Sequence, residues 1–186
     1  MTAPVQHPMY IDGQFVTWQG DAWIDVTNPA TEELLSRIPD GTAEDARKAI
    51  DAADKAQPAW EPLPAIERAG WLRKIAAGIR ARASEISALI VAEGGKIQQL
   101  ADVEVNFTAD YIDYMSEWAR RYEGEILQSD RPGENIFVFK RPLGVTTGIL
   151  PWNFPFFLIA RKLAPALITG NTIVIKPSEF TPNNAI

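Results

Sequence analysis

The chain has 186 residues, of which 46% are hydrophobic and 23% are charged. This composition is typical of a folded globular protein and excludes a wholly disordered chain. The net charge of -6 gives no electrostatic reason to expect nucleic-acid binding. No apolar run is long enough to span a membrane, and residues 1–10 lack the pattern of a signal peptide. We therefore expect a soluble cytoplasmic protein.

The sequence contains no cysteine and only one histidine, His7. Disulfides, Cys/His zinc sites and a cysteine nucleophile are therefore excluded within this chain. A Ser-His-Asp triad would have to use His7, which lies close to a terminus that we expect to be frayed. Any chemistry in which this chain takes part must be completed by residues elsewhere.

Two pairs of short strands are predicted at the start of the chain. Residues 10–16 alternate between apolar and polar around Asp12-Gly13, a dipeptide typical of type I′ hairpins. Residues 22–26 and 34–38 form a second pair, and Asn28-Pro29 turns the chain between them.

Four helices should follow. Thr42 caps the first, with Asp45 at the reciprocal capping position, and Pro58 ends it. The second opens at Pro64, and the third runs from a cap at Ser84 to Gly94-Gly95. The fourth covers residues 97–122. One face of this helix carries Val103, Phe107, Tyr111, Tyr114 and Trp118. We expect this face to be core or an oligomer contact rather than a cofactor site.

The last third of the sequence predicts a β-ribbon and then a strand–helix–strand unit. Residues 135–140 alternate like one strand of a two-stranded ribbon. Residues 144–150 and 172–175 are short apolar strands joined by a helix over residues 156–168, so they should be parallel with a right-handed crossover. A parallel sheet of two strands is not a finished domain, because parallel sheets need further strands and two covered faces. We therefore expect this chain to be a truncated part of a larger protein.

Two loops at the carboxyl ends of these strands form the candidate site, because open α/β sheets bind ligands at that edge. In residues 148–155, the Asn153 amide can donate to a developing oxyanion, with a helix dipole behind it. The same residues could instead pack together as a rigid turn between the strand and the helix. The spacing of the residues alone favours neither interpretation. In the second loop, Lys176 and Glu179 could bond a ribose, although a solvated turn alone explains this tetrapeptide better.

Arg161 is the third candidate and follows Asn153 by eight residues. With Phe157 between them, the three side chains could share one helical face and line one cavity. Arg161 could equally lie on the solvated side of an amphipathic helix, which is the commoner place for an arginine. The sequence has no G-x-G-x-x-G fingerprint, and Gly95-Lys96 is not part of a Walker loop.

A combination of motifs is the most specific signal in the sequence. Residues 148–155 (GILPWNFP) are followed by 163–167 (LAPAL) and 170–182 (GNTIVIKPSEFTP), and residues 10–15 (YIDGQF) and 28–31 (NPAT) belong to the same pattern. Over the whole chain this pattern closely resembles the NAD-dependent aldehyde dehydrogenase superfamily. Residues 93–96 (EGGK) and 111–114 (YIDY) make it most similar to the bacterial lactaldehyde (glycolaldehyde) dehydrogenases.

The resemblance implies an α/β fold, namely the N-terminal portion of the aldehyde dehydrogenase fold. That portion has N-terminal strands, four helices and the first βαβ unit of a Rossmann-like parallel sheet. Residues 1–124 would belong to the coenzyme-binding domain, residues 125–141 to a β-ribbon used for homo-oligomerisation, and residues 142–186 to the NAD-binding sheet. The catalytic domain, with its nucleophilic cysteine and general-base glutamate, would lie beyond Ile186, so the isolated chain should be inactive.

The resemblance also assigns roles at the candidate site. Asn153 matches the oxyanion-hole asparagine, which stabilises the thiohemiacetal that forms when a cysteine attacks the aldehyde. Lys176 and Glu179 match contacts to the adenosine ribose, with Ser178 beside them. The carboxylate favours NAD, because it accepts from a 2′-hydroxyl and repels a 2′-phosphate. Positions that line the coenzyme cleft are matched by Ile149, Leu150, Pro151 and Trp152.

Phe157 and Arg161 match the substrate-tunnel helix of the family. A guanidinium in a tunnel would bond a hydroxyl or carboxylate, which implies a short hydroxyaldehyde such as lactaldehyde or glycolaldehyde, oxidised to its acid with NAD. The alternative is a non-catalytic remnant or assembly fragment of such an enzyme. No metal site and no nucleic-acid or membrane partner is expected.

Overall fold

The computed structural model describes residues 4–186, an α/β structure in which five strands are followed by four helices, a two-stranded ribbon and a strand–helix–strand unit. Residues 1–3 lie outside the described residues. They belong to the N-terminal segment in which we expected no signal peptide. The strands are β1 (Val5–Gln6), β2 (Met9–Ile11), β3 (Gln14–Val16), β4 (Trp23–Thr27), β5 (Leu34–Pro39), β6 (Glu125–Gln128), β7 (Asn135–Val138), β8 (Val145–Ile149) and β9 (Thr172–Lys176). The helices are α1 (Ala43–Trp60), α2 (Ala65–Ala81), α3 (Ala83–Gly94), α4 (Gln98–Ser116) and α5 (Pro155–Ile168), with the short 3-10 helices η1 (Glu117–Arg120) and η2 (Asn183–Ala185).

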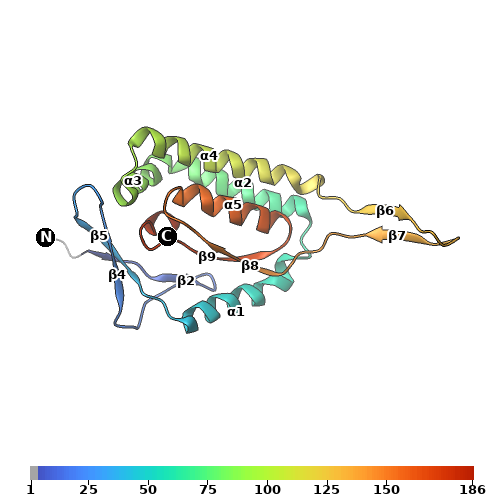
Figure 1. Ribbon diagram of the computed structural model, residues 1–186, viewed down its shortest axis with the longest axis horizontal. Coiled ribbons are helices and arrows are strands. Elements are labelled where there is room, and N and C mark those ends of the chain that lie inside the picture. Colours follow the sequence, from blue (N-terminus) through green and yellow to red (C-terminus); the bar gives the residue numbers. More distant parts are fainter. Residues whose placement is uncertain (1–3) are drawn as a thin grey trace.

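The parallel pair β8 and β9 lies between helices, with α1 on one face and α5 on the other (Figure 1). Helices α2 and α4 pack on α5 and form a further layer. Gly148 allows α5 to lie close to β8, because a Cβ there would come within 2.8 Å of the Ile175 side chain and 3.2 Å of Lys162 Cβ. The predicted βαβ unit is therefore present, with its sheet covered on both sides.

Two buried amides hold the starts of the two strands. The Asn171 side-chain oxygen accepts from the main-chain N–H groups of Leu143 (2.6 Å) and Gly144 (3.0 Å), just before β8. The Gln57 side chain of α1 donates to Gly170 O (2.9 Å) and accepts from Thr172 N (2.8 Å). These bonds fix where each strand begins, and hence where its carboxyl end lies.

The main apolar core lies between α2, α4 and α5. Most of its fully buried members are small, which lets the three helices approach closely. They are Ala69, Leu72, Ala76, Ala109, Ile112, Ala160, Ala164 and Ile168. A second cluster, formed by Ile90, Ala101 and Val105, packs α3 against α4.

The large side chains predicted as a possible core face of the fourth helix are mostly exposed. Val103, Phe107 and Tyr114 are each more than half exposed, and only Tyr111 packs against the core. The face of α4 that packs against α2 and α5 instead carries small, aliphatic and polar side chains, among them Glu104, Ala109 and Ile112. The expectation of core is therefore wrong for this stripe, and the oligomer contact stays a prediction. The helix also ends earlier than expected, at Ser116.

The predicted capping box of α1 is confirmed. Thr42 Oγ1 accepts from Asp45 N (3.3 Å), and the Asp45 carboxylate accepts from Thr42 N (2.9 Å). The prediction that Pro58 ends this helix is wrong, because α1 continues to Trp60. Pro58 lies in the last turn, where its missing N–H removes only one helical hydrogen bond.

The boundaries of α3 agree with the sequence at one end only. Gly95 ends the helix in the left-handed conformation (φ 63°), as expected. Ser84 does not cap it, because α3 begins at Ala83 directly after α2 and Arg82 occupies the capping position without a side-chain bond. The two helices follow each other so closely that no separate cap is formed.

The N-terminal strands form as predicted. Strands β2 and β3 pair antiparallel, and Asp12 and Gly13 both have positive φ (53° and 75°), as a type I′ turn requires. Strands β4 and β5 pair antiparallel, and β1 adds a parallel strand to β5. His7 N donates to Arg37 O (2.9 Å), so the expected fraying is wrong at His7, whose pKa is lowered by burial.

Strands β6 and β7 form an antiparallel ribbon that projects from the rest of the molecule (Figure 1). All of their residues are exposed. The structure thus confirms a ribbon near residues 125–141, while its use in oligomerisation stays a prediction. Among residues 4–186, no helix is both long and apolar enough to cross a membrane.

Arg68 ties α2 to the end of α5, and its removal should be destabilising. Arg68 is 8% exposed, and its guanidinium donates to Ile168 O (3.1 Å), Glu61 O (3.0 Å) and Leu63 O. Arg68→Met would leave these carbonyls without their donor, so we expect the free energy of unfolding in urea to fall by about 3 kcal/mol. The exposed Arg73→Met is the matched control, and equal losses in both variants would contradict this role.

Candidate functional site

The carboxyl ends of β8 and β9 bring the two candidate loops to one edge of the sheet. Ile149 pairs with Lys176 at the ends of the strands, and Leu150 N donates to Lys176 O (3.0 Å). Asn153 and Glu179 therefore follow adjacent strand ends, as the parallel arrangement required. The edge combines an amide and a carboxylate, each on its own loop.

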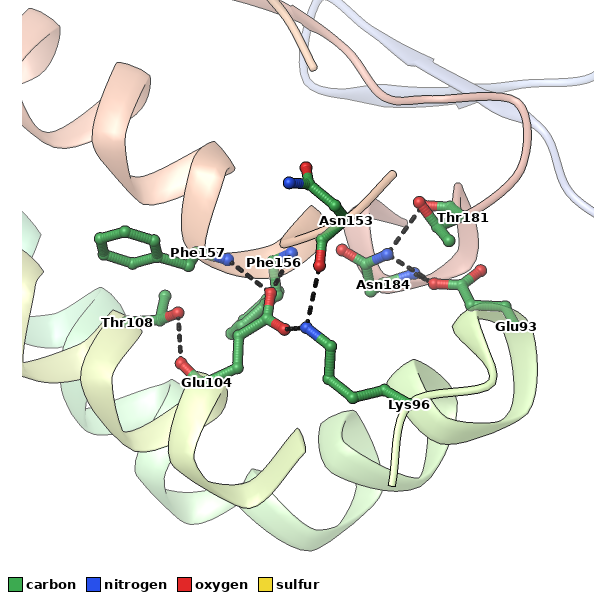
Figure 2. Close-up of polar contacts among 9 residues, drawn as sticks. All are labelled: Glu93, Lys96, Glu104, Thr108, Asn153, Phe156, Phe157, Thr181 and Asn184. Carbon is green, nitrogen blue, oxygen red and sulfur yellow. Dashed lines mark hydrogen bonds and ion pairs between the residues drawn. The ribbon is translucent and has the colours of Figure 1, made fainter. Parts of the chain in front are cut away.

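The loop after β8 presents apolar side chains and one amide to the surface. Ile149 is 76% exposed and Trp152 59%, whereas Leu150 is buried. Asn153 is exposed, and among residues 4–186 its side-chain amide has no hydrogen-bond partner. Figure 2 shows this side chain pointing away from Lys96, while the Asn153 main-chain oxygen points toward the Lys96 ammonium, at 3.0 Å. The amide is thus free to bond a ligand.

The loop after β9 carries an exposed ion pair. Lys176 Nζ lies 3.1 Å from Glu179 Oε2. The pKa of the Glu179 carboxyl is lowered, first by a hydrogen bond from its own main-chain N–H and then by Lys176, so the carboxylate is charged at neutral pH. Ser178 is buried instead, and its hydroxyl accepts from Phe180 N (3.3 Å) within the turn.

The other two candidates lie in helix α5, whereas Asn153 precedes it. Phe157 and Arg161 lie one turn apart in α5, where the Phe157 ring packs on Phe107 (4.6 Å between centroids) and Arg161 is exposed. Asn153 precedes the helix, because Pro155 occupies its first position and the residue before a proline disfavours helical geometry. The expectation that all three share one helical face is therefore wrong for Asn153.

Two buried carboxylates to which the sequence analysis assigned no role lie below this edge (Figure 2). Glu104 Oε1 accepts from Phe156 N (3.0 Å) and Phe157 N (3.1 Å), and its other oxygen pairs with Lys96. Glu93 accepts from the main-chain N–H groups of Asn183 (2.7 Å) and Asn184 (3.0 Å), and burial raises the pKa of its carboxyl. Glu93 stood out only as part of the motif in residues 93–96, and nothing in the sequence indicated that either carboxylate is buried, because a glutamate on a helix is usually solvated.

The family of the chain follows from a comparison with family models. The model described as the aldehyde dehydrogenase family matches residues 15–186. The chain therefore belongs to the aldehyde dehydrogenase family, and the structure is an N-terminal portion of that fold.

Individual relatives from the same family match the whole chain or nearly all of it. The chain is 87% identical over all its 186 residues to lactaldehyde dehydrogenase of Escherichia coli, and it spans 39% of the length of that protein. A crystal structure of lactaldehyde dehydrogenase from Escherichia coli matches with a TM-score of 0.97 at 86% identity, over 98% of this chain and 38% of that one.

More distant relatives differ in coenzyme. A betaine aldehyde dehydrogenase from Staphylococcus aureus, solved in complex with NAD+, matches with a TM-score of 0.92 at 32% identity, over 97% of this chain and 37% of that one. The D-glyceraldehyde dehydrogenase (NADP(+)) of Thermoplasma acidophilum is 40% identical over 95% of this chain and 36% of its own length. A nicotinamide coenzyme is common to these relatives, and they do not fix which one.

Proposed function

We propose that this chain forms the N-terminal part of an NAD-dependent dehydrogenase that oxidises short hydroxyaldehydes, such as lactaldehyde or glycolaldehyde, to their acids. The observation that carries the proposal is the single sheet edge at which the Asn153 amide, without a partner among residues 4–186, and the Glu179 carboxylate follow adjacent strands. The 87% identity to a lactaldehyde dehydrogenase supports the same reaction. Ligand binding at this edge is the general rule for open α/β sheets.

The proposed division of the chain follows the layers of the fold. Residues 1–124 and 142–186 would belong to the coenzyme-binding domain, which joins α1 and α2–α4 to the β8–α5–β9 unit through the buried contacts described above. Residues 125–141 would be the oligomerisation ribbon, whose exposed apolar side chains suit a second subunit. The nucleophilic cysteine and general-base glutamate would come from sequence beyond residue 186.

The residues present fit a nicotinamide dinucleotide. The Glu179 carboxylate can accept from both hydroxyls of the adenosine ribose, and the Lys176 ammonium can donate to a ribose oxygen. Ile149, Pro151 and Trp152 are exposed beside them and would line the cleft, whereas Leu150 and Ser178 are buried and would support the two loops. A charged carboxylate favours NAD over NADP, because it repels a 2′-phosphate. When bound, the coenzyme supplies the hydride acceptor.

Asn153 would act on the substrate oxygen. Attack of a cysteine thiolate on the aldehyde carbon makes a tetrahedral thiohemiacetal, in which the former carbonyl oxygen carries negative charge. The Asn153 side-chain amide can donate to that oxygen without first breaking a hydrogen bond within the described residues. A donor that needs no reorganisation is the most effective kind in such a site.

Arg161 is the proposed determinant of substrate polarity. Its guanidinium is exposed on α5, one turn after Phe157, and can bond the hydroxyl of a hydroxyaldehyde. Arg161→Leu should lower kcat/KM for glycolaldehyde about tenfold and improve use of apolar aldehydes such as butanal. The measurement compares both aldehydes in one enzyme, with the neighbouring Lys162→Leu as control. An unchanged preference for glycolaldehyde would count against this role.

The proposed function is tested in a full-length enzyme, made by placing this chain in register before the remaining residues of the Escherichia coli relative, of which it spans 39%. We expect glycolaldehyde and lactaldehyde to be oxidised with formation of NADH, and the 186-residue chain alone to show no turnover. A full-length enzyme that folds but oxidises neither aldehyde would support the alternative, a non-catalytic remnant.

A further inference from the structure

We propose that the buried ion pair of Lys96 and Glu104 is a positioning device that sets the place of Asn153. The inference rests on the proposed function, because it concerns the residue assigned to the oxyanion. Lys96 lies between α3 and α4, and Glu104 lies in α4. Their side chains are 14% and 0% exposed. Lys96 reaches the segment that joins β8 to α5, and Glu104 reaches the first turn of α5 (Figure 2).

Glu104 caps a helix other than its own. Helix α5 begins after Phe154, which provides no side-chain cap, so its first N–H groups need outside acceptors. Glu104 Oε1 accepts from two of them, at Phe156 (3.0 Å) and Phe157 (3.1 Å). A negative charge at this position also interacts favourably with the positive, N-terminal end of the α5 dipole. The carboxylate therefore fixes where α5 starts.

Lys96 holds the residue that carries the amide. Its ammonium donates to the Asn153 main-chain oxygen (3.0 Å) and lies 3.9 Å from the centroid of the Phe154 ring. In the described structure this is the sole hydrogen bond to residues 151–153. Without it, the position of Asn153 would depend on packing and on the two flanking prolines alone.

Stability alone does not explain a buried charge pair at this place. Desolvating two charges is expensive, and apolar residues of similar volume often replace such a pair with no loss of stability. Apart from the ion pair itself, the hydrogen bonds and the cation–π contact made by the Lys96 ammonium and the Glu104 carboxylate within residues 4–186 are all to residues 153–157. The Thr108 hydroxyl bonds the main-chain oxygen of Glu104 instead. A displacement of about 1 Å at a reacting group can lower a rate about a hundredfold. The arrangement therefore suits control of Asn153.

The test is a double-mutant cycle between Lys96→Met and Asn153→Ala in the full-length enzyme. Lys96→Met alone should lower kcat about ten- to a hundredfold, with KM for NAD and glycolaldehyde within about twofold. If Lys96 acts through Asn153, adding Lys96→Met to Asn153→Ala should lower kcat by less than about twofold further. The exposed Lys74→Met is the control and should not change kcat.

A second variant guards against loss of folding when one charge is left unpaired. Lys96→Met/Glu104→Gln removes both charges, so its unfolding midpoint in urea should exceed that of Lys96→Met while kcat stays low. Hydrogen–deuterium exchange at Phe156 and Phe157 should be faster in this variant, independently of turnover. Fully additive losses in the cycle, or a wild-type kcat in the double-charge variant, would overturn the inference. Absence of aldehyde oxidation by the wild-type enzyme would instead overturn the proposed function.

Discussion

Asn153→Ala should lower kcat of the full-length enzyme about a hundred- to a thousandfold, with little change in KM for NAD. The reason is that one oxyanion donor typically contributes that much to the rate. The side chain is exposed and has no partner within residues 4–186, so its truncation removes a donor without removing packing. Steady-state kinetics with glycolaldehyde measures the effect.

The control for Asn153 is another exposed asparagine. Asn106 lies on α4, where its amide donates to Asp102 O (2.9 Å), and Asn106→Ala should leave kcat unchanged. A loss of less than about tenfold in Asn153→Ala would contradict the assigned role. The same holds for a large loss that is accompanied by an equally large fall in the free energy of unfolding.

Glu179→Gln should change the coenzyme preference. The substitution keeps the shape of the side chain and removes its charge, so a 2′-phosphate is no longer repelled and Lys176 is released from its 3.1 Å ion pair. We expect the ratio of kcat/KM for NADP to that for NAD to rise about tenfold or more. Both coenzymes are compared at saturating aldehyde.

A remote glutamate provides the matched control for the coenzyme experiment. Glu123→Gln removes the same charge at an exposed position that follows η1, away from the sheet edge. The ratio should be unchanged in this variant. If both substitutions change the ratio equally, general charge rather than a contact to the ribose explains the preference.

Local signals made much of the fold predictable. Asp12-Gly13 specified the hairpin, Thr42 with Asp45 specified the start of α1, and Gly95 specified the end of α3, because each depends on a few neighbouring residues. The parallel pairing of β8 and β9 followed from the strand–helix–strand order. The same pairing brought the Asn153 and Glu179 loops to one edge.

The remaining features depend on contacts between segments distant in the sequence. Apolar periodicity favoured the aromatic face of α4 as core, but the close approach of α2 and α5 selected the face with Ala109 and Ile112. Glu104 bonds main-chain groups more than fifty residues away, which no local pattern reveals. Membership of the aldehyde dehydrogenase family came from the combined motifs, because the site has no single specific spacing of its own.

A crystal structure of the full-length enzyme with NAD tests the central claim most directly. The adenosine ribose hydroxyls should lie within hydrogen-bond distance of the Glu179 carboxylate, and the nicotinamide ring should lie on the side of the sheet edge where Asn153 presents its amide. NAD bound away from the carboxyl ends of β8 and β9 would contradict the account.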